Sequence, residues 1–210
     1  MRLYRYTSLE FIPSCVENGA YASHLSNIND PYEGRGIRYP NQYRVVCLTK
    51  APFQMLMWAY YGNHKGCRIT YEVDDSNVKP VEYTTDFQSH EDMTTKQVIE
   101  SLYRKGKEWK HENEYRVVYH DPTADRDLWT VDGEKVFLKA QVKEVVFGLL
   151  ADEDDRYLEM LKYLQKHNRN QEKIDVSKCR LMSDRYQLEA DKQFDIDSEI
   201  RMLEKGSEKS

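Results

Sequence analysis

Two glutamates separated by one residue, Glu112 and Glu114, come just before the hydrophobic run YRVVYH. That run predicts a strand, and the period of two along a strand places both carboxylates on the same side. Such a pair at the end of a sheet can hold a ribose and face a developing positive charge. The competing interpretation is that both are solvated residues at a strand edge, with Arg116 paired to one of them.

The first segment, RLYRYTS, alternates aromatic and basic residues and predicts an opening strand. Alternation sends Arg5 to the opposite face from Tyr4 and Tyr6. The planar fork of an arginine suits a phosphate or diphosphate, so Arg5 is a candidate for binding one. The alternative is an exposed arginine on an edge strand.

A third cluster begins at Thr49, directly after the buried run YRVVCL. A hydroxyl at this position can orient a catalytic carboxylate. The next predicted helix, over 53–61, carries Tyr60 and Tyr61, either of which can stack against a flat ring. The alternative for these aromatic residues is core packing.

The polar loop NDPYEG contains Asn29, Asp30 and Glu33, ends at Gly34 and is followed by a second glycine, Gly36. Its length and polarity favour the rim of a ligand site. The same residue types also form Asx turns, so both interpretations stay open.

Hydrophobic spacing predicts many strands and few helices. Strands are expected over 2–8, 20–25, 43–48, 67–73, 114–120, 136–138, 142–150, 174–181 and 185–189, and helices over 53–61, 94–107 and 152–166. The strands are not each followed by a helix, which predicts one α+β domain over 1–190 with mixed or antiparallel central sheets and short helices. Residues 191–210 are expected to form a charged helix and a frayed end. Neither a Gly-x-Gly-x-x-Gly motif nor a Walker loop is present.

Charge and composition exclude several classes of function. The 31 basic and 36 acidic residues give a net charge of −5, which argues against binding nucleic acid by bulk electrostatics. No apolar run approaches the roughly 20 residues of a spanning helix, so we expect no membrane partner and a cytoplasmic location. The four cysteines form no Cys-x-x-Cys pair, and His24, His64 and His111 share no ligand spacing, so no metal site is expected. No serine or cysteine is marked as a nucleophile by its sequence neighbours.

Several segments, taken in order, resemble the bacterial family called domain of unknown function 2971. They are LYRYTS, NDPYEG, CLTK, MWAYYGNHKGCRITYEV, WKHENEYR and VKEVVFG, and they span most of residues 1–190. More distantly, the order of a basic aromatic strand, a strand ending in a hydroxyl and a Glu-x-Glu strand start resembles the ADP-ribosyltransferase superfamily. That resemblance implies an ADP-ribosyltransferase-like fold and NAD as the substrate.

The resemblance also implies roles for individual residues. Arg5, Thr49 and Glu114 would grip NAD, with Glu114 and Thr49 catalytic and Glu112 in the accessory position. The residues expected to bind NAD are Arg5, Tyr4, Tyr60, Tyr61, Asn29 and Asp30, and residues 104–111 would take the place of the substrate-recognition loop. Lys50 and Ala51 follow Thr49, so the serine-threonine-serine pattern of many transferases is missing.

The expected function is therefore cleavage of the nicotinamide–ribose bond of NAD and modification of a protein or nucleic acid target, as in a toxin or phage-defence effector. This bond breaks with oxocarbenium character, which a single carboxylate can stabilise because nicotinamide leaves without a proton. The alternatives are a non-catalytic module that binds a nucleotide or protein and a metal-dependent nuclease. The nuclease requires Asp30, Glu33, Glu112 and Glu114 to converge around Mg²⁺.

Overall fold

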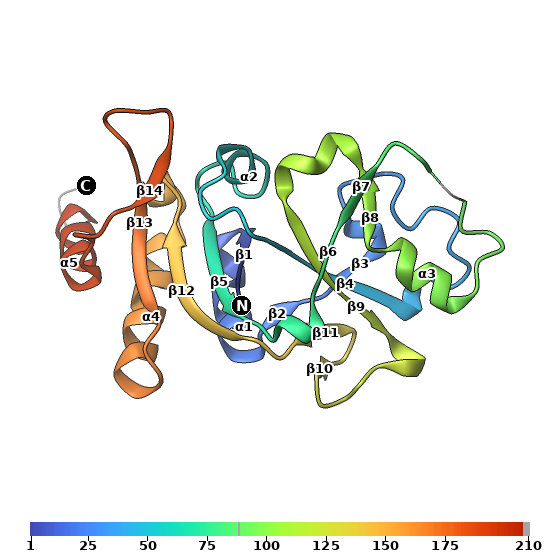
Figure 1. The fold of residues 1–210 in the computed structure, drawn as a ribbon. Helices are drawn as coiled ribbons and strands as arrows, with labels where there is room; N and C mark the ends of the chain where they lie inside the picture. Colours follow the sequence, from blue (N-terminus) through green and yellow to red (C-terminus); the bar gives the residue numbers. More distant parts are fainter. Residues whose placement is uncertain (88, 208–210) are drawn as a thin grey trace. The chain divides into compact units, whose positions relative to one another are not determined.

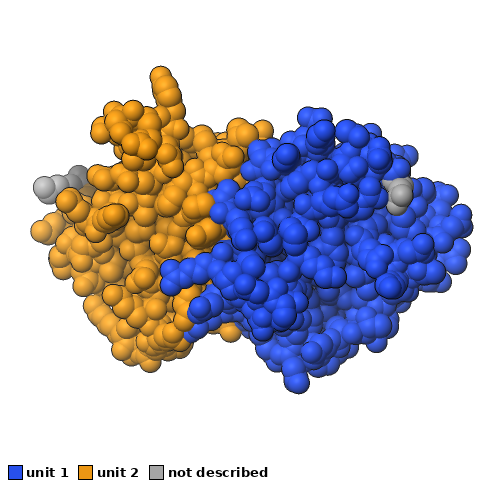
Figure 2. Space-filling model, in the orientation of Figure 1, with its two compact units in different colours: residues 1–3, 18–51, 72–141 blue, residues 4–17, 52–71, 142–210 orange. Residues whose placement is uncertain are grey.

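The computed structural model describes residues 1–87 and 89–207. The chain has the predicted mixed α+β architecture, with several sheets and a few short helices (Figure 1). Its residues form two compact units, each assembled from three stretches of sequence (Figure 2). Unit 1 contains residues 1–3, 18–51 and 72–141, and unit 2 contains 4–17, 52–71 and the chain from residue 142. The last part of the predicted frayed end, 208–210, lies outside the described residues.

Unit 1 is built mainly of short strands. They are β2 (Ala20–Tyr21), β3 (Ser23–His24), β4 (Tyr43–Thr49), β6 (Lys79–Pro80), β7 (Glu82–Thr84), β8 (Arg104–Gly106), β9 (Glu114–His120), β10 (Trp129–Asp132) and β11 (Lys135–Leu138), with the helix α3 (Thr95–Ser101). β4 and β9 pair antiparallel along their whole length, and β3 and β6 pair with their outer edges. Two smaller sheets, β10-β11-β2 and the parallel pair β7-β8, complete the unit.

The long strands of unit 1 form because β-branched residues occupy their buried positions. Val45, Val46 and Val117 are buried in the β4-β9 pair, where β-branched side chains pack well. α3 begins with a capping box between Thr94 and Gln97. Its apolar face then packs against β4, through contacts that include Val98.

One predicted element of unit 1 is too long. The helix expected over 94–107 ends at Ser101, because Arg104–Gly106 forms β8 and pairs in parallel with β7. This pairing buries Lys105, a residue type that is rarely buried without a charged partner.

Unit 2 contains most of the helical residues. The elements that lie wholly or mostly in it are β1 (Arg2–Thr7), α1 (Ile12–Asn18), α2 (Met55–Tyr60), β5 (Cys67–Glu72), β12 (Gln141–Phe147), α4 (Tyr157–Asn170), β13 (Asp175–Leu181), β14 (Leu188–Ala190) and α5 (Ile196–Ser207). The sheet order is β14-β13-β12-β5-β1. α4 connects β12 to its parallel neighbour β13, and the predicted pairing of the last two strands is confirmed as the antiparallel pair β13-β14.

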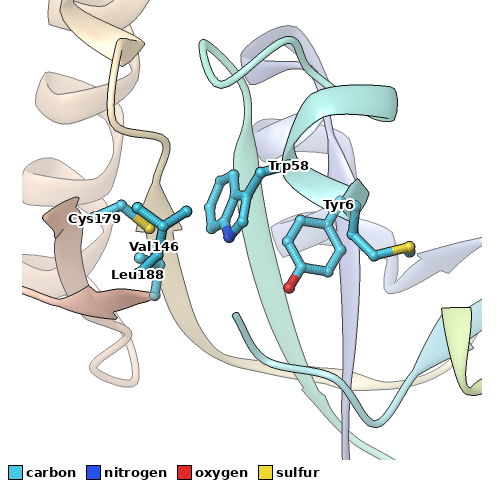
Figure 3. Packing of buried hydrophobic residues seen from close by; sticks show 6 residues of the cluster. Tyr6, Trp58, Val146, Cys179 and Leu188 are labelled. Atoms are coloured by element: carbon cyan, nitrogen blue, oxygen red, sulfur yellow. The ribbon is translucent and has the colours of Figure 1, made fainter. Parts of the chain in front are cut away.

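Aromatic residues fill the core of unit 2 next to α2. The rings of Tyr6 and Trp58 meet edge to face with centroids 4.9 Å apart, and Figure 3 shows Trp58 between Tyr6 and the side chains of Val146, Cys179 and Leu188. Such an edge-to-face contact stabilises the fold by about 1 kcal/mol beyond the effect of burying the two rings. No helix within 1–87 and 89–207 combines the length and the apolar character needed to cross a membrane.

Candidate functional site

The two glutamates singled out from the sequence meet at one lysine in unit 1. Glu112 ends the 3₁₀ helix Lys107–Glu112, Asn113 turns the chain in the left-handed region with φ 45°, and Glu114 begins β9. Lys105 Nζ donates to Glu112 Oε2 at 2.5 Å and to Glu114 Oε2 at 3.1 Å. The side chains of Glu112 and Glu114 are 2% and 4% exposed, so the interpretation of both as solvated residues at a strand edge is wrong. The two carboxylates reach one cation through a turn, not through the pleat of a strand.

Arg116, on β9, is the centre of the same cluster and is fully buried. Its Nε donates to Glu114 Oε1 at 2.7 Å, and its Nη2 donates to Glu114 Oε2 at 2.9 Å. Nη1 donates to the carbonyl of Leu102 at 2.7 Å, and Nη2 also donates to Glu33 Oε1 at 2.6 Å. The predicted pairing of Arg116 with one of the two glutamates is confirmed, in the bidentate geometry that arginine favours.

The charges around Glu114 hold it ionised. Burial alone raises the pKa of a carboxyl group, but Arg116 and Lys105 outweigh burial and lower the pKa of Glu114 to about 2. For the Lys105 ammonium the effect of burial has the opposite sign and lowers the pKa. The nearby carboxylates of Glu114, Glu33 and Glu112 outweigh this effect of burial, so the pKa of Lys105 is raised. Both oxygens of Glu114 are occupied by these cations.

Glu33 is the third carboxylate in a cluster that holds two cations. Its side chain is 4% exposed, and Arg116 satisfies Oε1. Oε2 is buried and has no hydrogen-bond partner among the described residues. Burial raises the pKa of Glu33 to about 7, with Arg116 and Lys105 offsetting part of the effect. The group is therefore present in both protonation states near neutral pH, which is typical of functional carboxyls.

A pocket of about 380 Å³ lies beside this cluster, within the range of roughly 300–1,000 Å³ usual for small-molecule sites. Its lining comes from the loop after β3, from residues around β7 and β8, and from α3. The lining residues are Asp30, Tyr32, Glu33, Gly34, Thr84, Thr85, Asp86, Phe87, His90, Ser101, Leu102, Arg104, Lys105, Gly106, Lys107 and Glu108. Tyr32 and Phe87 are 56% and 48% exposed, with ring centroids 5.4 Å apart.

Asp30 joins the NDPYEG loop to β8. Its Oδ1 accepts from the Tyr32 amide at 3.0 Å, which is an Asx turn, and its Oδ2 accepts from the Gly106 amide at 3.2 Å. Asp30 also lines the pocket, so the loop is both a turn and a pocket wall. Asn29 is exposed and lies outside the lining.

Thr49 lies opposite Glu114 in the β4-β9 register. Its Oγ1 donates to the carbonyl of Glu112 at 2.5 Å and accepts from the Ala51 amide at 2.9 Å. The single hydroxyl proton is therefore bound to the main chain, and not to the carboxylate of Glu114 as predicted. Thr49 fixes the turn that carries the two glutamates.

The other predicted NAD-binding residues belong to unit 2. The Cζ atom of the Arg68 guanidinium lies 4.7 Å from the centroid of the Tyr4 ring, and the charge of Arg5 lowers the pKa of the Cys15 thiol against the larger effect of burial. Tyr60 ends α2 and is exposed, and Tyr61 packs against the aromatic core. The roles of Arg5, Tyr4, Tyr60 and Tyr61 toward NAD stay predictions.

Of the four carboxylates on which a nuclease would depend, three converge around two cations and the fourth, Asp30, binds a backbone amide beside them. Lys105 and Arg116 are bound by Glu33, Glu112 and Glu114, and Asp30 binds the adjacent Gly106 amide. Among the residues described, no group of three or more His, Cys, Asp or Glu side chains is placed to hold a metal ion. The role of Lys105 in this cluster was not predicted from the sequence. Its burial depends on the β7-β8 pairing, and no local sequence pattern indicates that pairing.

The chain matches no protein-family model and has no significant match to a curated protein or a solved structure. The two resemblances proposed from the sequence therefore stay predictions.

Proposed function

We propose that unit 1 cleaves the nicotinamide–ribose bond of NAD, with Glu33 as the carboxylate that faces the reacting ribose. The supporting observation is the buried, unpartnered Oε2 of Glu33 in the wall of a small-molecule-sized pocket. This differs from the role expected for Glu114, whose two oxygens are bound by Arg116 and Lys105.

The chemistry requires one ionised carboxylate. As the bond breaks, the ribose gains oxocarbenium character, and a negative charge next to it lowers the barrier. Arg116 holds Oε1 of Glu33, which orients Oε2 for this role. Glu114, Glu112 and Lys105 in turn hold Arg116 and the turn beside it, so they position the reacting group.

The remaining pocket residues suit the other parts of a dinucleotide. Tyr32 and Phe87 present aromatic rings to a flat base, and Arg104 and Lys107 supply positive charge for the diphosphate. The ADP-ribose would then pass to a macromolecular target, as a toxin or phage-defence effector would require.

The experiment incubates the full chain with NAD and measures released nicotinamide by chromatography. We expect Glu33→Gln to abolish release, because the amide keeps the shape of the side chain but cannot carry the negative charge. The matched control is Glu91→Gln, an exposed glutamate near the same pocket and outside its lining. Glu114→Gln is measured in parallel, with its rate corrected for the folded fraction.

Three results are informative. Release that is lost in Glu33→Gln and kept in Glu91→Gln supports the assignment. Release that persists in Glu33→Gln and is lost in folded Glu114→Gln returns the catalytic role to Glu114. No release by the wild-type chain, at any enzyme concentration tested, rejects NAD cleavage altogether.

A second candidate is a binding module without catalysis. The observation that favours it is the saturation of the cluster: Glu114 and Arg116 satisfy one another in a fully buried, bidentate pair. Under this function NAD would raise the melting temperature by linkage, and prolonged incubation would form no nicotinamide.

A further inference from the structure

A histidine, a serine and an asparagine form a hydrogen-bonded relay in unit 1, away from the Glu33 pocket. His24 ends β3, Ser26 lies in the following 3₁₀ turn Leu25–Asn27, and Asn41 comes from the 3₁₀ turn Pro40–Gln42. His24 Nδ1 lies 2.7 Å from Ser26 Oγ, and His24 Nε2 lies 2.8 Å from Asn41 Oδ1.

The neighbouring contacts fix the direction of the relay. His24 Nδ1 also accepts from the Ser26 backbone amide at 3.1 Å, so this nitrogen carries the lone pair of the neutral ring. The proton then sits on Nε2 and is donated to Asn41 Oδ1, while the Ser26 hydroxyl donates to Nδ1. A second acceptor for the hydroxyl, Asn27 Oδ1, is more distant at 3.3 Å.

Capping alone does not account for this arrangement. His24 caps the 3₁₀ turn through the Ser26 amide, and this needs only one ring nitrogen and no serine hydroxyl. The contact to Asn41, 17 positions away in the sequence, holds the other ring nitrogen. The hydrogen bonds run from the hydroxyl of Ser26 to the imidazole of His24 and from there to the amide of Asn41. Cys-His-Asn hydrolases connect their nucleophile, imidazole and amide in the same sequence of contacts.

The relay opens on a hollow of about 530 Å³. Polar and charged side chains dominate its lining, which consists of Tyr21, His24, Ser26, Asn27, Arg44, Asp132, Glu134 and Lys135 and shares no residue with the Glu33 pocket. Ser26 is exposed, so a substrate can reach its hydroxyl. Arg44 Nη1 donates to the Asn41 carbonyl at 2.7 Å and holds the turn that orients His24.

We propose that Ser26, His24 and Asn41 form a second active site, which hydrolyses short polar carboxylic esters. Ser26 Oγ attacks the ester carbonyl carbon as its proton passes to His24 Nδ1. The carbon–oxygen bond to the leaving alcohol then breaks, and the alcohol takes the proton from His24. A water molecule, deprotonated by the same nitrogen, attacks the acyl-serine and releases the carboxylic acid and the free serine.

Two cations and one amide assist these steps. Arg44 and Lys135 line the hollow and supply positive charge against the oxyanion of the tetrahedral intermediate. Asn41 is a positioning residue, because its side-chain oxygen binds the imidazole of His24 and holds the tautomer and orientation of that ring.

The test treats the full chain with a fluorophosphonate probe, which phosphonylates activated serines, and with p-nitrophenyl acetate. We expect mass mapping to place the phosphonyl group on Ser26, and hydrolysis to release p-nitrophenol. Ser26→Ala abolishes both signals and leaves the cap intact, because the backbone amide remains. Ser23→Ala, a neighbouring serine outside the lining, keeps both at the wild-type level.

His24→Gln is expected to slow labelling about 100-fold or more, the usual contribution of a general base. Asn41→Ala is expected to slow it as well, and Asn41→Asp to restore it, since a carboxylate accepts the same Nε2 proton. The proposal is overturned if the wild-type protein is not labelled at Ser26. It is equally overturned if Ser26→Ala hydrolyses the ester at the wild-type rate.

Discussion

At the scale of single residues, Glu114 holds two buried cations and contributes to stability whatever its part in catalysis. Arg116 is fully buried and Lys105 nearly so, and both depend on its carboxylate. Removing one partner of a buried ion pair leaves an uncompensated charge and costs about 3–5 kcal/mol. We therefore expect Glu114→Gln to lower the melting temperature by roughly 10 °C, since each kcal/mol corresponds to about 2–4 °C for a chain of this size.

Differential scanning calorimetry measures this shift, with Glu91→Gln as the control. Glu91 is exposed, so its change should stay within about 0.5 kcal/mol of the wild type. A Glu114→Gln protein that melts with the wild type would contradict the view that this carboxylate anchors the cluster.

At the scale of elements, the turn at Asn113 lets Glu112 and Glu114 share Lys105. Asn113 is exposed and adopts φ 45° and ψ 52°, a conformation that asparagine tolerates better than a β-branched residue does. We expect Asn113→Val to lower the free energy of unfolding by about 1–3 kcal/mol. Asn113→Gly should stay within roughly 0.5 kcal/mol, because glycine adopts the same dihedral angles without strain.

Urea unfolding of the two variants distinguishes a backbone effect from a side-chain effect. Equal losses in both variants would mean that the asparagine side chain matters, and not its left-handed backbone. Intact stability in Asn113→Val would show that the turn is not needed to bring the two glutamates together.

The elements also show which features of this fold could be predicted. The strand over 114–120 was predicted with its observed bounds, because a run of β-branched and aromatic residues is a strong local signal. The helix over 94–107 was extended too far, because apolar spacing continues past Ser101 while the β7-β8 pairing decides the conformation of Arg104–Gly106. The sequence of one short segment does not indicate which distant segment it pairs with.

The same distinction applies to the site. Glu112, Glu114 and Asp30 were found because acidic residues at strand starts and in polar loops are conspicuous in sequence. The role of Lys105 was not predicted, and Glu33 was considered for a ligand rim, an Asx turn or a metal, because the importance of both residues arises from burial. The relay of His24, Ser26 and Asn41 joins two turns and has no spacing that could be recognised beforehand.

At the scale of the whole molecule, the cluster links folding to pH in two opposite directions. The pKa of Glu114 is lowered from 4.5 to about 2, so its stabilisation is present above pH 4.5 and is lost as the pH falls toward 2. The pKa of Glu33 is raised from 4.5 to about 7 by burial, so its contribution is fully present below pH 4.5 and is lost as the pH rises through 7. Together the two groups favour greatest stability near pH 5.

The contribution of Glu33 can be isolated because glutamine in its place cannot titrate. Between pH 5 and pH 8 the wild-type protein should lose up to about 3 kcal/mol of unfolding free energy through this residue, at about 1.4 kcal/mol for each unit of pKa shift. Urea unfolding at both pH values, for the wild type, Glu33→Gln and Glu91→Gln, measures the difference, since each variant differs from the wild type in one titrating group alone. A decline that is as steep in Glu33→Gln as in the wild type would place the pKa of Glu33 near its ordinary value. The carboxylate of Glu33 would then be ionised throughout the range from pH 6 to 8, and the site would lack the near-neutral carboxyl inferred from its burial.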